Sequence, residues 1–173
     1  MGGTKTIATV VTGLSLCSLA LGCAGHHAPP GTAPTDAVAV VELRPQAHQT
    51  LREQIIQEAA VAEAHGLSPF LELTSDVSRR CFLLDHSFDD PGMRAALSGT
   101  YIIRIDINRW VGRFGETGLD RIPMALPGFV ELFSGGRGIG PFVDARSWIA
   151  DAPSAVAPSL GAFVHSAVDR QGF

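Results

Sequence analysis

The stretch SPFLELTSDVSRRCF, residues 68–82, decides the fold of this chain. It begins with an apolar run that is typical of a buried β-strand. Ser78 then belongs to a residue type that favours the capping position before a helix, and Cys81 follows one turn later. Redox proteins carry a Cys-x-x-Cys pair at such a junction, whereas this chain has Ser-Arg-Arg-Cys.

Length and composition favour one domain that follows a targeting segment. The chain has 173 residues, and 46% of them are hydrophobic, which is enough apolar material for a real core. The formal net charge is −4, and there is no basic run. Nucleic acid is therefore not an expected partner.

The N-terminus resembles a bacterial lipoprotein signal. One lysine precedes an apolar stretch, residues 7–21, that is too short for a comfortable membrane-spanning helix. It ends in LALGC, which resembles the lipobox, in which cleavage precedes a cysteine that is then acylated. The resemblance implies lipidation at Cys23 and anchoring in a bacterial membrane. An ordinary secretory signal with an incidental cysteine is the alternative.

A flexible tether is expected after Cys23, because Pro, Gly, Ala and Thr dominate residues 24–36. His26 and His27 lie there without further metal ligands nearby, so we expect a solvated linker and no metal site. The predicted organisation is a signal peptide at 1–22, a lipidated cysteine and tether at 23–36, and one folded domain at 37–173. The domain would face the periplasm or the cell exterior.

The thiols can be counted from this organisation. Cys17 leaves with the signal peptide and Cys23 carries the lipid, so Cys81 is the one free thiol expected in the mature protein. An intramolecular disulfide is then impossible. A lone thiol in an oxidising compartment is either buried or reactive.

The hydrophobic pattern predicts alternating strands and helices. We expect strands at 37–43, 68–74, 100–107, 128–133 and 141–145, and helices over 46–66, from Ser78, over 89–97 and over 152–168, with one short helix within 108–126. The Gly-rich stretch 134–140 is expected to be a hairpin turn. This order predicts an α/β fold with a central mixed β-sheet flanked by helices.

Two segments together resemble the thioredoxin-like domains of disulfide reductases. Residues 68–108 contain the strand, the helix junction, an Asp-Asp-Pro helix restart and a second strand, and ALPGFVELFSGGRG at 125–138 contains a proline before a strand and a Gly turn. The resemblance covers residues 37–168 and implies a thioredoxin-like fold.

The resemblance also assigns positions around the junction. Ser78 occupies the place of the attacking cysteine, and Cys81 occupies the place of the resolving cysteine. Val77 replaces the usual tryptophan. Glu72 lies six residues before Ser78, where the family usually has a buried acid, and it could accept the proton of Cys81.

Pro127, preceded by Leu126, matches the cis-proline that faces the active-site helix in the family. The loop before such a proline exposes backbone groups that can pair with an extended peptide. A binding surface of this kind would survive the loss of redox chemistry. We therefore expect a protein or peptide partner near Pro127.

The chemistry of the junction argues against dithiol catalysis. A serine hydroxyl at position 78 has far too high a pKa to act as the attacking thiolate. Cys81 is then either an inert buried residue or a single thiol that forms mixed disulfides, which the flanking Arg79 and Arg80 could favour.

The expected function is a lipid-anchored, redox-impaired protein that binds a protein partner. A monothiol oxidoreductase that uses Cys81 is the first alternative, and a purely structural envelope lipoprotein is the second. The sequence predicts no cofactor.

Overall fold

The computed structural model describes residues 37–122, 124–133 and 135–171. The predicted signal peptide, Cys23 and the tether lie outside these residues. The strands are β1 (Val38–Glu42), β2 (Ser68–Thr74), β3 (Thr100–Asp106), β4 (Gly128–Phe133) and β5 (Gly138–Asp144), and the helices are α1 (Leu51–Ala64), α2 (Arg79–Asp85), α3 (Pro91–Ala96) and α4 (Pro153–Gln171). None of the described helices is long and apolar enough to cross a membrane.

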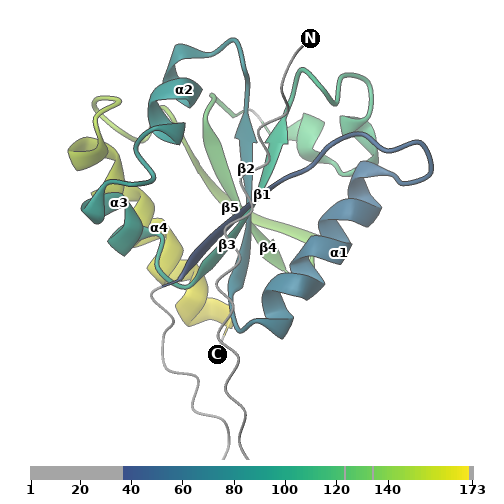
Figure 1. Ribbon diagram of the computed structural model, residues 1–173, viewed down its shortest axis with the longest axis horizontal. Helices are drawn as coiled ribbons and strands as arrows, with labels where there is room; N and C mark the ends of the chain where they lie inside the picture. Colours follow the sequence, from purple (N-terminus) through teal and green to yellow (C-terminus); the bar gives the residue numbers. More distant parts are fainter. Residues whose placement is uncertain (1–36, 123, 134, 172–173) are drawn as a thin grey trace, which may run out of the picture. The chain divides into compact units, whose positions relative to one another are not determined.

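The five strands form one mixed sheet in the order β1-β3-β2-β4-β5. β3 pairs in parallel with both β1 and β2, whereas β4 is antiparallel to β2 and β5 is antiparallel to β4 (Figure 1). The predicted α/β fold with a central mixed sheet is thereby confirmed.

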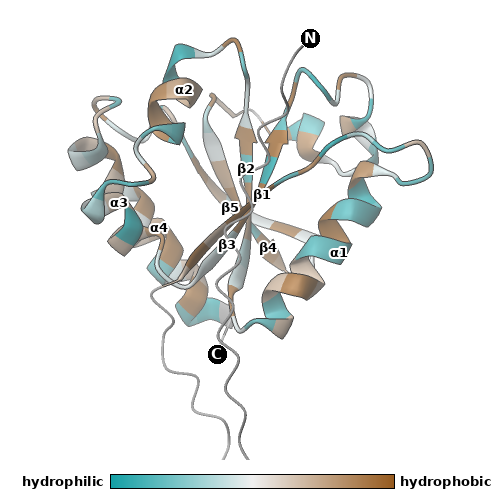
Figure 2. Ribbon diagram, in the orientation of Figure 1, coloured by the Kyte–Doolittle hydropathy of each residue, from teal (hydrophilic) through white to brown (hydrophobic). Residues whose placement is uncertain are grey.

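Helices cover both faces of the sheet. Figure 1 shows α1 on one face and α3 and α4 on the other. Neighbouring strand residues point to opposite faces, so Phe70 packs in the core under α3 and α4, and Leu71 packs in the core under α1. Figure 2 shows apolar segments along the central strands and mixed colouring on the flanking helices, as expected for amphipathic helices.

Helix α1 begins later than predicted. The sequence pattern suggested a helix over 46–66, but α1 starts at Leu51 because Thr50 caps it. The Thr50 side chain accepts a hydrogen bond from the Glu53 N–H at 3.1 Å, and the Glu53 carboxylate accepts one from the Thr50 N–H at 2.7 Å. This reciprocal capping box fixes the start of α1 at Leu51, so residues 46–50 stay outside the helix.

Other elements also differ from the expectation. The segment 108–126 holds two single-turn 3-10 helices, Phe114–Glu116 and Leu119–Arg121, instead of one short helix. β5 begins at Gly138 rather than at residue 141, because the hairpin ladder with β4 continues toward the turn. The predicted hairpin turn is confirmed, and at Gly136 in that turn a side chain would lie 3.0 Å from the Ala59 Cβ of α1.

Candidate functional site

Ser78 caps helix α2. Its backbone is extended, with φ −89° and ψ 119°, and its Oγ accepts a hydrogen bond from the Cys81 N–H at 3.4 Å. A further bond, from the Ser78 N–H to the Ser75 carbonyl at 3.1 Å, closes the turn that follows β2. The predicted helix start at Ser78 is confirmed, and the hydroxyl satisfies a backbone donor of the first helical turn.

Cys81 lies one turn into α2 with 2% of its surface exposed, and it forms no disulfide. It contributes to a hollow of about 260 Å³ under α2, at the ends of β1, β2 and β3. We call this hollow the Cys81 pocket. Its lining residues are Glu42, Thr74, Ser75, Asp76, Cys81, Phe82, Asp85, Arg104, Asp106 and Arg109.

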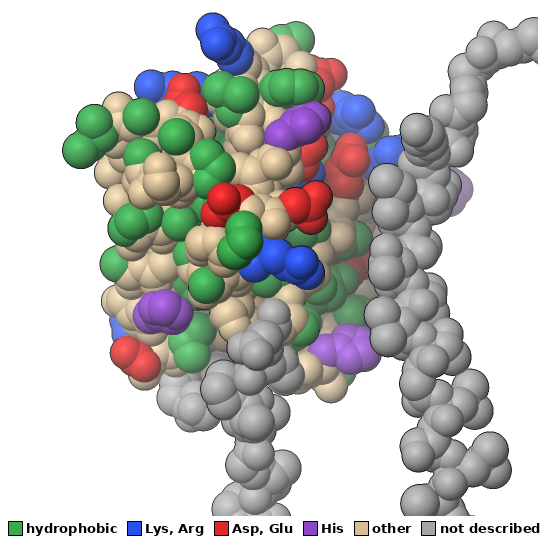
Figure 3. Space-filling model, turned by 60° about the vertical axis from the view of Figure 1, so that its left-hand side comes forward, with side chains coloured by type: hydrophobic (Ala, Val, Ile, Leu, Met, Phe, Trp, Pro, Cys, Tyr) green, Lys and Arg blue, Asp and Glu red, His purple; other side chains and the backbone are tan. Residues whose placement is uncertain are grey.

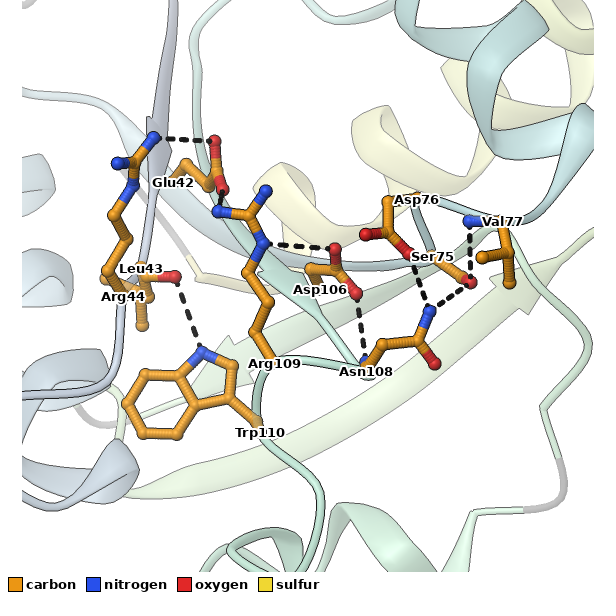
Figure 4. Close-up of polar contacts among 10 residues, drawn as sticks. All are labelled: Glu42, Leu43, Arg44, Ser75, Asp76, Val77, Asp106, Asn108, Arg109 and Trp110. Atoms are coloured by element: carbon orange, nitrogen blue, oxygen red, sulfur yellow. Dashed lines mark hydrogen bonds and ion pairs between the residues drawn. The ribbon is translucent and has the colours of Figure 1, made fainter. Parts of the chain in front are cut away.

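Charged side chains at the strand ends line the Cys81 pocket, and Figure 4 draws the polar contacts that several of them make. The Arg109 guanidinium lies between two carboxylates, with Nη1 at 3.0 Å from Glu42 Oε1 and Nε at 3.3 Å from Asp106 Oδ2. Asn108 donates from its N–H to Asp106 Oδ1 at 2.9 Å and from its side-chain amide to Asp76 Oδ1 at 2.8 Å. These contacts join the ends of β1, β2 and β3.

Glu72 is completely buried and pairs with Arg104, its register partner on β3. Arg104 Nε donates to Glu72 Oε2 at 2.8 Å, and Arg104 Nη1 donates to Asp85 Oδ1 at 2.5 Å. Burial raises the pKa of the Glu72 carboxyl above its ordinary value, although the Arg104 charge acts in the opposite direction. The expected burial of this acid is confirmed, and its role as proton acceptor for Cys81 stays a prediction.

The Leu126–Pro127 peptide bond is cis, as the resemblance implied. Ala145 joins Pro127 to helix α2, because its N–H donates to the Pro127 carbonyl at 3.0 Å and its carbonyl accepts from Arg80 Nη1 at 3.1 Å. Arg80 Nε also lies 3.0 Å from Asp151 Oδ1. The structure thus brings Pro127 next to the helix that begins at Ser78.

The backbone of Leu126 has no hydrogen bond to any other residue in the described part of the chain. Pro127 itself is buried, whereas Val77 is 84% exposed. We use the name Ser78 surface for Val77, Ser78 and Leu126 together with Pro127 and Ala145, the buried residues that link the Leu126 loop to α2.

Asp144 holds the loop that leads to Leu126. Its side chain, 3% exposed, accepts hydrogen bonds from the Ala125 N–H at 2.9 Å and from the Arg146 guanidinium at 2.6 Å. Burial alone raises the pKa of Asp144, but the hydrogen bonds from Arg146 and from the Ala125 N–H outweigh it and hold the pKa below its ordinary value.

Sequence reasoning did not identify the charged residues of the Cys81 pocket. A signal was present on strand 100–107, where Arg104 and Asp106 share a face with the buried Ile102. A charge at an inward position of a buried strand requires a partner, and Glu72 occupies the matching face of β2.

Other features of the surface do not suggest an ion site. No group of three or more His, Cys, Asp and Glu side chains among the described residues could hold a metal ion. Figure 3 shows acidic, basic and apolar side chains interspersed on one face of the molecule. Trp110 and Trp148 are buried in the two hydrophobic cores, where they act as packing residues.

Comparison with known proteins gives a match in structure alone. No family model matches the sequence, and no curated protein matches it significantly. A disulphide isomerase structure from Xylella fastidiosa Temecula1 superposes with a TM-score of 0.51 at 16% identity, covering 73% of this chain and 97% of that chain. Thioredoxin O1 from Arabidopsis thaliana gives a TM-score of 0.39 at 17% identity, covering 62% and 85%. The sheet topology and the match to the isomerase show that this chain has a thioredoxin-like fold.

Proposed function

We propose that the protein is a lipid-anchored, thioredoxin-like protein that binds a protein partner without dithiol catalysis. The observation that carries this proposal is the capping bond at α2. Ser78, at the position of the attacking cysteine, uses its hydroxyl to accept from the Cys81 N–H. The lipid would be attached to Cys23 and would hold the domain at the bacterial cell envelope.

Dithiol exchange needs two thiols that act one after the other. A thiolate attacks the substrate disulfide, forms a mixed disulfide, and a second thiol then releases the substrate. A hydroxyl does not perform the first step, and Cys81 lies behind it with 2% of its surface exposed. The pair Ser78 and Cys81 therefore supports binding better than turnover.

The Ser78 surface supports binding of an extended peptide. Val77 offers an exposed apolar side chain, and Leu126 offers backbone groups with no partner in the described residues. A peptide that runs along Leu126 can pair with this backbone and place an apolar side chain against Val77. Neither contact involves a thiol.

Photo-crosslinking in the native host tests this proposal. A photo-reactive residue at Val77 should yield a discrete crosslinked partner protein. The matched control is Val111, which is 77% exposed but lies in the loop after β3. The same partner at both positions, or no partner at Val77, would contradict the proposal.

The lipid anchor has a separate test. Metabolic labelling with a fatty-acid analogue should label the wild-type chain and should not label Cys23→Ser. Lack of label on the wild type would favour the alternative of an ordinary secretory signal. The lipid anchor would then be removed from the proposal, and the proposed binding at the Ser78 surface would stand.

Monothiol chemistry at Cys81 is a second candidate because Cys81 lines a hollow that Ser78 does not line. A small disulfide that enters the Cys81 pocket could be attacked by the Cys81 thiolate. One S–S bond would break, one mixed disulfide would form, and the other half would leave as a thiolate. The rate at which Cys81 reacts with alkylating reagents separates this candidate from the first.

A further inference from the structure

A second polar hollow lies away from the Ser78 surface, between the end of β1 and helix α1. Its volume is about 280 Å³, and four glutamines contribute to its lining: Gln46, Gln49, Gln54 and Gln57. We call it the glutamine hollow. Glu42, Leu43 and Arg44, which Figure 4 draws at the end of β1, also line it.

Gln54 is the most unusual of these residues. Only 5% of its surface is exposed, and its Nε2 is buried without a hydrogen-bond partner in the described residues. An unpartnered buried amide lowers stability, and an apolar side chain of the same shape would avoid this cost. Its neighbour Ile55 shows that α1 has apolar residues at other buried positions. A ligand that pairs with the amide would explain why glutamine occupies position 54.

The surrounding amides add donors and acceptors at the mouth of the hollow. Gln49 Nε2 donates to Gln57 Oε1 at 2.8 Å, which uses one donor of one amide and one acceptor site of the other. Each primary amide has two N–H donors and a carbonyl with two lone pairs. Glu58, also in the lining, accepts from the Tyr101 hydroxyl at 2.7 Å and retains a second carboxylate oxygen.

A neighbouring hollow continues this polar surface. It has a volume of about 450 Å³, shares Gln46 and Gln49 with the glutamine hollow, and is also lined by His48, Arg113 and Glu116. The shared residues belong to the turn before α1, which therefore borders both hollows. A ligand made of two linked polar units could occupy both.

We propose that the glutamine hollow binds a neutral saccharide, with a second sugar unit in the neighbouring hollow. Adjacent sugar hydroxyls match a primary amide, because one hydroxyl donates to the amide carbonyl while the other accepts from the amide N–H. The volume of about 280 Å³ lies at the small end of ligand pockets, which suits one sugar ring. This inference is independent of the proposed partner binding and of Cys81.

Saturation-transfer NMR on the full chain tests the inference. The probes are maltose, cellobiose and di-N-acetylchitobiose, and triglycine serves as a neutral amide comparator. We expect at least one disaccharide to bind with a dissociation constant of about 1 mM, as suits a small polar ligand. Gln54→Met should weaken that binding about tenfold or more, because the amide supplies the buried contacts.

Stability provides the second readout. Gln54→Met should melt at the same temperature as the wild type or higher, because it removes a buried amide nitrogen that has no hydrogen-bond partner among the described residues. The matched control is Glu63→Met on the same helix, an exposed position outside both hollows that should leave binding unchanged. Three results would overturn the inference: no disaccharide binds the wild type, Gln54→Met binds as well as the wild type, or triglycine binds as tightly as the sugars.

Discussion

The Ser78 surface and the Cys81 pocket meet at one turn of helix α2, yet they differ in chemistry. The Ser78 surface carries an exposed valine and the backbone of Leu126, which has no hydrogen-bond partner among the described residues. The Cys81 pocket carries a buried thiol among paired carboxylates and guanidinium groups. In a dithiol enzyme both cysteines act on one substrate, whereas here the residue at the surface is a serine and the thiol contributes to a separate, charged hollow.

This difference separates the proposed binding surface from the thiol within the fold. The Ser78 surface depends on the hydrogen bonds of Ala145 with Pro127 and with the Arg80 guanidinium, and neither contact uses Cys81. The pocket depends on ion pairs at the ends of the strands. Changes at Leu126, Pro127 or Ala145 should therefore leave the Cys81 pocket intact.

The largest expected effect is on disulfide-reduction activity and comes from Ser78→Cys. This variant would remove the difference between the two regions, because each would then carry a thiol. The Ser78 Oγ lies 3.4 Å from the Cys81 N–H nitrogen, so the new thiol should reach Cys81 and form a disulfide on oxidation. We expect disulfide reduction at least about tenfold above the wild type. Thiol counting and a disulfide-reduction assay measure both outcomes.

Ser87→Cys is the control, since Ser87 follows α2 at its other end; Ser87 is buried and Ser78 is half-buried. Its new thiol should not form a disulfide with Cys81. Failure of Ser78→Cys to form the disulfide would contradict the assignment of Ser78 to the attacking position.

The next largest effect is on the free energy of unfolding and should come from Arg104, which lines the Cys81 pocket. Arg104→Met leaves Glu72 buried without its ion-pair partner, and removal of one partner of a buried pair costs about 3–5 kcal/mol. Urea unfolding followed by far-UV circular dichroism measures the loss. The double variant Glu72→Gln/Arg104→Met should recover much of it, and an equal loss in both variants would show that the pair is not the cause.

Asp144→Asn should weaken the loop that supports Leu126. The carboxylate accepts from the Ala125 N–H and from Arg146, so we expect a loss of about 1–3 kcal/mol at neutral pH. The pKa of Asp144 is lower in the folded state than its ordinary value of 3.8. Its stabilisation is therefore fully present above about pH 3.8 and is lost as the pH falls through the folded-state pKa.

Unfolding curves at neutral and acidic pH test this dependence. The stability difference between the wild type and Asp144→Asn should shrink as the pH is lowered. Asp120→Asn, at an exposed position, should show little difference at either pH. A difference for Asp144→Asn that does not change with pH would rule out the carboxylate as its source.

The smallest effect should come from Ser78→Ala, which removes the N-cap of α2. We expect it to lower the free energy of unfolding by about 1 kcal/mol. Ser78→Asn should retain the stability because asparagine also caps helices well. If alanine and asparagine give equal stability in thermal unfolding, the Ser78 hydroxyl does not act as the cap.

The order of elements could be predicted because each element carries a local signal. The apolar run at 68–74, the Asp-Pro start at 90–91 and the Gly turn before β5 depend on neighbouring residues alone. The late start of α1 was also visible, since Thr50 and Glu53 have the spacing of a capping box. The predicted helix over 46–66 was too long at its start because it did not take that spacing into account.

The site was predicted only in part, because its contacts join distant parts of the chain. Ser78, Cys81 and Glu72 lie within one short segment and were found. The partners of that segment come from β3 and from the end of β5: Arg104 pairs with Glu72, and Ala145 links Arg80 to Pro127. Hydrophobic periodicity cannot show which charged residues of separate strands share an end of the sheet.

The alkylation rate of Cys81 tests the central claim most directly. The measurement uses the full chain with Cys17→Ser and Cys23→Ser, folded and unfolded, from about pH 4 to about pH 10. If the protein binds its partner without thiol chemistry, Cys81 should react rapidly only after unfolding, as its 2% exposed surface implies. Rapid labelling of the folded chain, with a midpoint well below about pH 8.5, would contradict the account and assign the function to a reactive thiol in the Cys81 pocket.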